Sequence, residues 1–269
     1  MKSFGFRVSS FELGYGRAER AMNSKPETRN RKLETRNPAL PFVFINMAIT
    51  ADGKIATANR SVSSFGSRRD KDHLLELRAT ADAVMSGAGT VNSGPITLGP
   101  GSVKFRRIRT RRGLAEYNIR IVASRGGNVN PHAEIFKKKF SPIIILTTGR
   151  AGEDKLKTLR ELATEVKILG PREIDFRKAL QWLREKWKVK RLLCEGGGEL
   201  NDALFRAGLV NELHLTICPK IFGGGLAPTI AEGAGVSKLS RAAQLKLKSM
   251  KRVGDELFVI YTVTQKQSL

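Results

Sequence analysis

The alternation of apolar runs with amphipathic segments constrains the fold of this chain more than any other feature of its sequence. Short continuous apolar runs are typical of strands buried on both faces, whereas apolar residues spaced three and four apart predict helices. Strands and helices that alternate along a chain favour an α/β fold with a largely parallel sheet. The predicted strands cover residues 42–49, 83–85, 119–123, 143–147, 166–169 and 192–194.

Helix signals fill the segments between these strands. Ser67, followed three residues later by Asp70, can cap a helix that carries Leu74, Leu77 and Arg78. Further helices are predicted near residues 131–139, 153–163 and 175–187. The helix near residues 175–187 has an apolar stripe, which core packing explains without a cofactor.

The two ends of the chain differ from its middle. Residues 213–218, 245–250 and 257–264 have the pattern of strands without long helices between them, which predicts antiparallel additions at one sheet edge. Residues 1–40 are polar and basic, and a stretch at 27–33 is repeated with changes at 34–40. Two copies are too few for a solenoid, so we expect residues 1–40 to be a disordered extension and residues 41–269 to form one domain.

The chain is strongly basic, with 48 Lys and Arg residues against 25 Asp and Glu residues and a formal net charge of +23. Such a charge attracts polyanions and anionic small molecules alike. The densest basic stretch, residues 104–112, has the pattern of a loop. It carries no recognisable RNA-binding or DNA-binding signature, so we do not expect specific nucleic-acid binding.

Cysteine usage and hydropathy bear on the cellular environment. Cys194 and Cys218 each lie within an apolar run, which predicts buried free thiols rather than a disulfide or a metal site. No apolar run approaches the length that spans a bilayer, and no secretory signal is recognisable. We therefore expect a cytoplasmic protein without a membrane partner.

Glycine-rich or polar turns follow three of the predicted strands. Residues 195–198 place one acid and three glycines between a strand and a segment with helical spacing at 200–207. Glycines let a backbone approach a ligand, and free amides at a helix start favour an anion, although a tight connection between packed elements explains this turn equally well. Residues 52–54 and 86–90 follow two other strands. Because the carboxyl ends of parallel strands meet at one sheet edge, the three turns together predict a cofactor cleft, without the glycine spacing of a standard Rossmann domain.

In this order, the motifs resemble the reductase domain of riboflavin biosynthesis, which has the dihydrofolate-reductase-like fold. The resemblance covers most of residues 41–265, and its specificity comes from the motifs taken together. They are residues 51–56, 77–79, 82–84, 87–91, 195–200 and 208–213, followed by Pro219 and Lys220. The resemblance implies a three-layer α/β/α domain, with a mostly parallel central sheet and antiparallel C-terminal strands, that forms a homodimer.

The resemblance also implies the chemistry, an NADPH-dependent reduction that opens the ribosyl group of a ribosylaminopyrimidine 5′-phosphate to a ribityl chain. Glu195 matches a substrate-contacting acid that donates a proton or orients the substrate, and Lys54 matches a polar position near the reacting ribose. Arg78 matches the substrate-phosphate position, where a guanidinium can hold phosphate through two hydrogen bonds. Asp52 is a further substrate position, for which a purely structural Asp-Gly turn is an equal alternative.

The remaining implied positions contact the cofactor. The glycine turn would seat the diphosphate, and Ser124 with Arg125 lies where the adenosine ribose or its 2′-phosphate would be held. The cofactor-binding positions are Ala48, Gly87, Gly89, Thr90, Ser124, Gly197, Gly198, Glu199 and Leu200.

Departures from the family pattern leave alternatives open. Members commonly carry two acids before the proline that follows the Gly-Thr-Val turn, whereas this chain has Asn92-Ser93-Gly94-Pro95, and Ala123 stands where an acid often precedes Ser124. A reductase of another heterocycle and a non-catalytic, polyanion-binding member therefore remain alternatives.

Histidines do not suggest a metal centre. His132 and Glu134 match only part of the zinc deaminase that bifunctional relatives carry, because the cysteine pair of that site is missing. We expect His132 at a helix start, and His73 and His214 in packing or at the surface.

Overall fold

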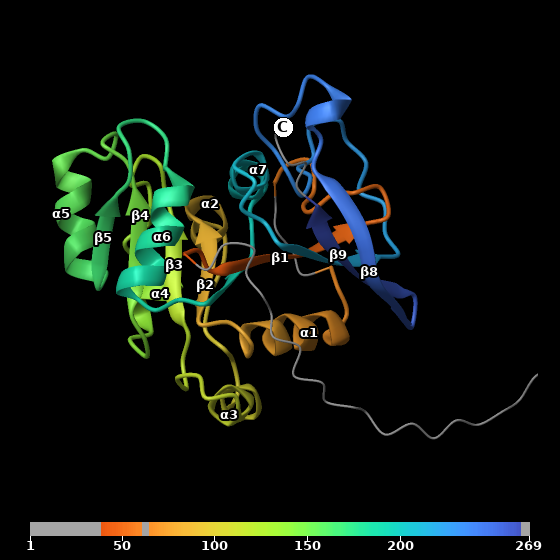
Figure 1. Ribbon diagram of the computed structural model, residues 1–269, viewed down its shortest axis with the longest axis horizontal. Helices are drawn as coiled ribbons and strands as arrows, with labels where there is room; N and C mark the ends of the chain where they lie inside the picture. The colour runs from red at the N-terminus through yellow and green to blue at the C-terminus, as the bar shows by residue number, and fades with distance from the viewer. Residues whose placement is uncertain (1–38, 61–64, 265–269) are drawn as a thin grey trace, which may run out of the picture. The chain divides into compact units, whose positions relative to one another are not determined.

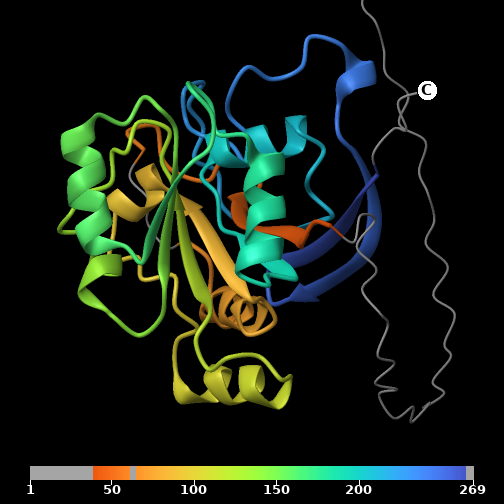
Figure 2. The same cartoon turned by 60° about the vertical axis from the view of Figure 1, so that its left-hand side comes forward.

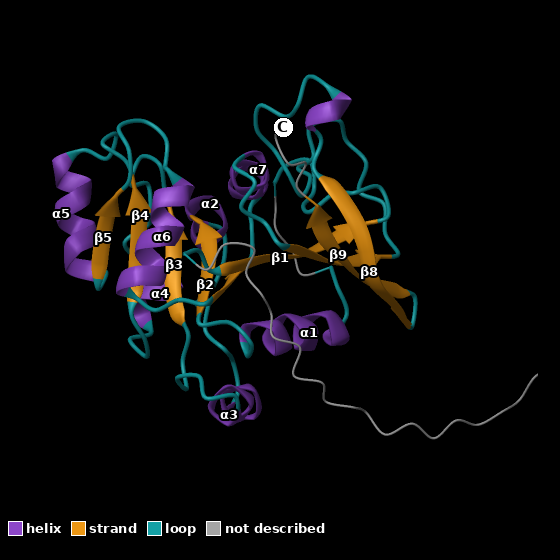
Figure 3. Ribbon diagram, in the orientation of Figure 1, coloured by secondary structure: helices purple, strands orange, loops and turns teal. Residues whose placement is uncertain are grey.

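The computed structural model describes residues 39–60 and 65–264, so the predicted extension over residues 1–40 lies almost entirely outside the described residues. The described strands form one nine-stranded sheet in the order β5-β4-β3-β2-β6-β1-β7-β9-β8 (Figures 1 and 3). The strands are β1 Phe42–Thr50, β2 Ala83–Gly87, β3 Ile119–Ala123, β4 Ile143–Thr147, β5 Glu165–Ile168, β6 Arg191–Cys194, β7 Glu212–Cys218, β8 Gln244–Val253 and β9 Glu256–Thr264. The helices are α1 Arg68–Arg78, α2 Ala88–Asn92, α3 Val103–Arg111, α4 Glu134–Lys137, α5 Glu153–Leu162, α6 Phe176–Lys186, α7 Gly198–Arg206 and the 3₁₀ helix η1 Leu239–Arg241.

The sheet is mostly parallel, as predicted. Neighbouring strands from β5 to β7 all pair in parallel, and the antiparallel pairs are β7 with β9 and β9 with β8. The prediction is wrong for β7, which we expected to be an antiparallel addition. It is parallel to β1 because α7 carries the chain from β6 past β1, the crossover connection that parallel strands require.

Helices cover both faces of the sheet and confirm the three-layer architecture (Figures 1 and 2). Successive side chains of a strand point to opposite faces, so β1 packs on both sides. Ile45 packs in one cluster with Leu180 of α6 and Leu204 of α7. Phe44 packs in the other cluster with Leu77 of α1. β1 is thus the centre of the core that supports the strand ends.

The basic stretch at residues 104–112 is the clearest error of the sequence prediction, because it forms helix α3 rather than a loop. This helix begins after Ser102 and buries Phe105 and Arg109, which are four residues apart. Only that narrow buried stripe marks the helix, since Lys104, Arg107 and Arg111 among its other positions are basic and exposed. Figure 2 shows α3 standing away from the sheet near α1.

The remaining predicted elements agree with the structure within a few residues, with two differences in length. The helix expected near residues 131–139 is reduced to the short α4, so that His132 precedes the helix, and β8 is longer than predicted. Cys194 and Cys218 are buried free thiols, as expected. None of the described helices is long and apolar enough to cross a membrane.

Candidate functional site

The turn after β6 is hydrogen-bonded to the end of β2. The amide of Glu195 donates to the Met85 carbonyl at 2.9 Å, and the amide of Gly87 donates to the Gly196 carbonyl at 2.8 Å. The Ser86 hydroxyl donates to the same Gly196 carbonyl at 3.0 Å. The two predicted glycine motifs are therefore joined at one sheet edge.

Among the glycines of these motifs, Gly198 has no room for a side chain, whereas a Cβ atom on Gly87 or Gly197 would reach only ordinary contact distance. A Cβ atom on Gly87 would lie 3.6 Å from the Gly197 nitrogen, and one on Gly197 would lie 3.5 Å from the Thr90 hydroxyl. A Cβ atom on Gly198 would lie 2.8 Å from the Thr229 carbonyl oxygen, so only glycine fits there. The N-cap of α7 is Gly197, and no side chain caps the first amides of this helix. Uncapped amides at a helix start are suited to binding phosphate.

The other predicted cofactor positions differ in their exposure. Gly89 is exposed on α2, and the Glu199 side chain in the first turn of α7 is 81% exposed. Leu200 is buried in the core, so only its backbone is available to a ligand. Ala48 is half-buried on β1, in register with Thr216 of β7.

Ser124 and Arg125 follow β3 at the same edge of the sheet. Ser124 is buried, and its amide donates to the Leu146 carbonyl at 2.9 Å. Arg125 donates to Glu173 at 2.9 Å, a hydrogen bond that raises the pKa of Arg125, and it lies 4.0 Å from the Glu199 carboxylate. Exposed ion pairs of this kind contribute little to stability, so an incoming anion can replace these carboxylates.

Arg78 and Glu195, predicted for separate roles, form a buried two-point ion pair. The Nε and Nη2 atoms of Arg78 each donate to a Glu195 oxygen at 2.6 Å. The Nη1 atom donates to the Gly99 carbonyl at 2.6 Å. These contacts engage three of the five N–H groups that a guanidinium offers. The side chains are only 11% and 10% exposed, so the pair fixes the Glu195 carboxylate in place.

Behind this pair lies Arg109, a residue that the sequence reasoning did not single out. It is 1% exposed, and its Nη1 atom donates to the carbonyls of Arg78 at 2.8 Å and Ala81 at 2.6 Å. Its Nε atom donates to the Ala115 carbonyl at 2.8 Å. Arg109 therefore joins α3 to the turn between α1 and β2. The one sequence signal was its spacing of four from Phe105 within the basic stretch.

The Asp52-Gly53-Lys54 turn binds the glycine loop that follows β7. Asp52 accepts hydrogen bonds from the Thr50 hydroxyl at 2.5 Å and the Gly223 amide at 2.7 Å. These bonds, the one from Thr50 foremost, lower the pKa of Asp52. The Lys54 ammonium donates to the Ala227 carbonyl at 3.1 Å. No hydrogen bond or ion pair between Lys54 and Glu195 occurs in the described part of the chain, so the structure does not bring these two candidates into contact.

The segment that replaces the two expected acids has its own contacts. The side-chain Nδ2 of Asn92 donates to the backbone carbonyl of Asn128 at 3.0 Å, and its Oδ1 accepts from the backbone amide of Asn130 at 2.9 Å. An ionised carboxylate cannot donate a hydrogen bond, so an acid at this position would lose the first contact. The Ser93 hydroxyl donates to the Thr90 carbonyl at 3.0 Å. The segment thus ties α2 to the loop before α4.

A second polar cluster lies between α1 and β7. His214 and Glu212 are joined by a hydrogen bond of 3.1 Å, and the rings of His73 and His214 have centroids 6.3 Å apart. Burial lowers the pKa of His73, with a further contribution from His214, and burial raises the pKa of Asp70. Across residues 39–60 and 65–264, no group of three or more His, Cys, Asp or Glu residues could hold a metal ion.

Comparison with known proteins identifies the family. The family model described as RibD C-terminal domain matches residues 41–259. The 2,5-diamino-6-ribosylamino-4(3H)-pyrimidinone 5′-phosphate reductase of Methanothermobacter thermautotrophicus is 33% identical over 223 residues, which are 83% of this chain and 98% of that protein. The enzyme of the same name from Aquifex aeolicus is 30% identical, over 84% of this chain and 98% of its own length.

Solved structures share the fold. A pyrimidine reductase-like protein of Corynebacterium diphtheriae superposes with a TM-score of 0.71 at 22% identity, over 84% of this chain and 93% of that one. Acinetobacter baumannii RibD gives a TM-score of 0.67 at 18% identity, over 84% of this chain and 58% of that longer chain. The sheet edge built from the glycine turns and the Arg78–Glu195 pair thus lies in a member of the RibD C-terminal domain family, the reductases of riboflavin biosynthesis.

Proposed function

We propose that this protein is an NADPH-dependent reductase that converts the ribosyl group of a ribosylaminopyrimidine 5′-phosphate to a ribityl group. The observation that carries the proposal is the joined glycine turns, which place the Arg78–Glu195 pair directly beside the uncapped start of α7. The relatives named as pyrimidinone phosphate reductases match over 98% of their length, which supports the same reaction here.

The residues at the sheet edge fit a nicotinamide dinucleotide. Gly87 and Gly197 carry no side chain beside Thr90, Gly198 begins α7, and the first amides of that helix lack a side-chain cap. When bound, the cofactor supplies the hydride for ribose C1′. The backbone of Glu199 and Leu200 belongs to the same helix start, while Gly89, Ala48 and Ser124 complete the predicted contacts.

Three arginines support NADPH rather than NADH as the cofactor. Arg125, Arg150 and Arg172 are exposed in the loops that follow β3, β4 and β5. The loops are linked, because the Thr148 hydroxyl donates to the Arg125 carbonyl at 2.7 Å and the Gly149 amide donates to the Gly170 carbonyl at 3.0 Å. A 2′-phosphate is the part of NADPH that guanidinium groups recognise.

Glu195 acts as an orienting carboxylate in this proposal. Its two-point pair with Arg78 holds it as an acceptor, so it positions a hydroxyl or amine of the substrate rather than donating a proton. Arg78 retains two N–H groups for the substrate phosphate. The Lys54 ammonium keeps two of its three N–H groups beyond the bond to Ala227. One of these would donate its proton to the ribose ring oxygen as C1′ takes up the hydride and the C1′–oxygen bond breaks.

A turnover assay tests the proposal. NADPH oxidation is followed with the deaminated uracil and with the diaminopyrimidinone forms of the ribosyl phosphate, and we expect turnover with at least one of them. For Glu195→Gln we expect kcat to fall by about 100-fold with the Kd of NADPH nearly unchanged, because the substrate loses its orienting charge. Glu185→Gln, at an exposed acid near the end of α6, serves as the control and keeps its kcat. Absence of turnover with both substrates, together with absence of saturable NADPH binding, would refute the proposal.

A second candidate function rests on α3. Lys104, Arg107 and Arg111 are exposed and lie along one face of this helix, at spacings of three and four residues. A non-catalytic member that binds polyanions would use this face. Retention of polyanion binding without NADPH turnover would favour this candidate over the reductase.

A further inference from the structure

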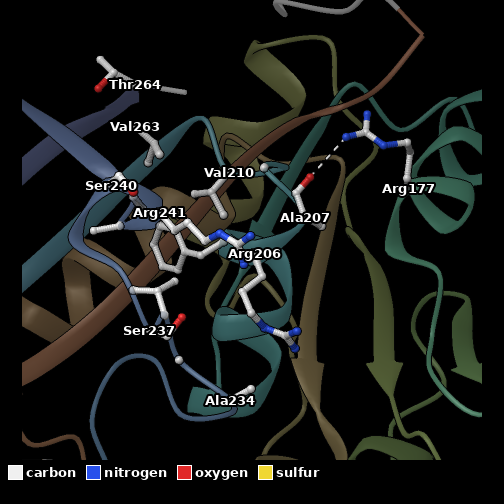
Figure 4. Close-up of a pocket in the computed structure, with 16 residues that line it drawn as sticks. Arg177, Arg206, Ala207, Val210, Ala234, Ser237, Ser240, Arg241, Val263 and Thr264 are labelled. Carbon is white, nitrogen blue, oxygen red and sulfur yellow. Dashed lines mark hydrogen bonds between the residues drawn. The ribbon is translucent and has the colours of Figure 1, made fainter. Parts of the chain in front are cut away.

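A hollow lies at the C-terminal end of α7, away from the glycine turn at the start of that helix (Figure 4). It has a volume of about 720 Å³ and is bounded by the end of α7, by residues 234–243 and by the end of β9. This volume falls within the range of small-molecule sites. α7 has nine residues, which separate its two ends by roughly 13 Å. A ligand here would therefore occupy a site distinct from the proposed cofactor seat.

Three arginines line this hollow, and none of the described residues that line it is acidic. Arg177 donates to the Ala207 carbonyl at 3.2 Å, which fixes its guanidinium against the last carbonyls of α7. Arg206 is held through its Nε atom by Asp202 at 2.7 Å, so its two terminal nitrogens remain available. Arg241 extends from η1 toward the end of α7 (Figure 4).

Hydroxyl groups and apolar side chains complete the wall. Ser237 and Ser240 add hydrogen-bond donors beside Arg241. Phe205 and Val263 line the same hollow and offer an apolar surface to a ring or hydrocarbon group. Guanidinium and hydroxyl groups bind phosphate through hydrogen bonds. The apolar wall favours a ligand whose phosphate is attached to an organic group.

The segment that borders the hollow also contacts the start of α7. The amide of Glu232 donates to the Gly198 carbonyl at 2.9 Å, and the Asn201 side chain donates to the Ile230 carbonyl at 2.8 Å. Ala234, two residues after Glu232, lines the hollow. The segment is thus anchored at one end to the core of the fold, which gives the hollow a fixed wall on that side.

We propose that this hollow is a second binding site, which takes a small molecule with a phosphate ester and a ring, of the size of a nucleoside monophosphate. Arg206 and Arg241 bind the phosphate, Arg177 adds positive charge at the rim, and the ring packs on Phe205. The site does not depend on the reductase reaction, because none of these residues belongs to the proposed cofactor or substrate positions.

Calorimetric titration with uridine 5′-monophosphate tests the site, with uridine as the probe that lacks the phosphate. We expect the nucleotide to bind saturably and uridine to bind at least tenfold more weakly. Arg241→Glu should raise the Kd of the nucleotide at least tenfold, because it reverses one charge of the phosphate cradle. Arg241 is exposed and its side chain supports no described element, so folding should be retained.

The matched control is Arg68→Glu, which makes the same charge change at the exposed start of α1 and should leave the Kd within twofold of the wild-type value. An equal loss in both variants would show that the nucleotide responds only to net charge. That result would overturn the proposed site. Three other results would do the same: a nucleotide Kd that Arg241→Glu leaves unchanged, a uridine Kd equal to that of the nucleotide, or the absence of saturable nucleotide binding. NADPH turnover is measured on the same samples, so failure of this site and failure of the reductase proposal are distinguishable.

Discussion

Arg78 and Glu195 are 117 positions apart in the chain, yet their side chains form a hydrogen-bonded ion pair at the candidate site. Sequence motifs predicted both residues, but not their pairing, because pairing depends on how α1 lies against the turn after β6. The pairing also changes the expected chemistry of Glu195. A carboxylate held by a guanidinium on both oxygens is suited to orienting a substrate.

Loss of either partner of this pair should destabilise the fold. Arg78→Ala and Glu195→Ala should each lower the free energy of unfolding by about 3 kcal/mol, because each leaves a buried charge without its partner. In the double variant the loss should fall short of the sum of the two by about 2 kcal/mol. Urea denaturation of the four proteins measures this coupling.

An exposed pair on the same helix provides the control. Arg69 and Glu76 also form a two-point pair, at 2.7 and 3.1 Å, but their side chains are 44% and 37% exposed. Their coupling should stay below about 1 kcal/mol, because solvent screens the charges. If the two pairs had equal coupling energies, burial of the Arg78–Glu195 pair would have no energetic consequence.

At the scale of whole elements, α1 and β7 meet through His73 and His214. Burial holds the pKa of His73 below the ordinary histidine value of 6.5, and His214 lowers it further. The unfolded chain therefore takes up a proton on His73 more readily than the folded protein does. Its contribution to stability is present above pH 6.5 and is lost as the pH falls through that value toward the folded pKa.

We accordingly expect His73→Gln to flatten the dependence of stability on pH. The free energy of unfolding of the wild-type protein should fall more steeply than that of the variant between about pH 7.5 and about pH 5.5. Urea denaturation at both pH values measures the two slopes. Parallel slopes would mean that His73 does not titrate differently in the folded and unfolded states.

The elements that the sequence predicted well are those with an unambiguous apolar pattern. The run at 143–147 became β4, and the stripe from Phe176 to Leu183 became the buried face of α6. The sequence failed where burial involves charged side chains, since Arg109 occupies a core position of α3 through hydrogen bonds to carbonyls. The direction of β7 was also missed, because strand direction depends on where α7 returns the chain.

For the candidate site, local patterns indicated the glycine turns at the strand ends, and the structure joins the turns that contain Gly87 and Gly197 by a hydrogen bond. Their role in cofactor binding stays a prediction. The contact of Asp52 with Gly223 joins positions 171 residues apart and depends on the folded loop. Side-chain partners of this kind are set by packing, which one sequence does not specify.

At the scale of the whole molecule, the sheet ends in a strand with exposed apolar side chains. β8 ends the strand order, and its Leu245, Leu247 and Met250 are 43%, 54% and 62% exposed. They are in register with Val263, Tyr261 and Val259 of β9, so they share one face. Exposed apolar edges favour association, and we expect a second copy of the chain to cover this one in a homodimer.

Leu247→Lys should therefore convert the dimer to a monomer, because it places a charge in the buried interface. Sedimentation equilibrium measures the mass of the wild-type protein and of the variant. Val103→Lys is the matched control, since Val103 is 48% exposed on α3, and it should remain a dimer. A monomeric wild-type protein, or a dimer that survives Leu247→Lys, would rule out this edge as the interface.

The segment between β2 and β3 has a consequence for engineering the chain. Gly99 accepts a hydrogen bond from Arg78, Asn118 donates to the Leu98 carbonyl, and Arg109 holds the turn that follows Arg78. A tag, a fused domain or a new pair of chain ends placed in residues 98–118 would therefore disturb the support of Glu195. The exposed turn at Gly254, between β8 and β9, makes no such contact with the site and is the better place to open or extend the chain.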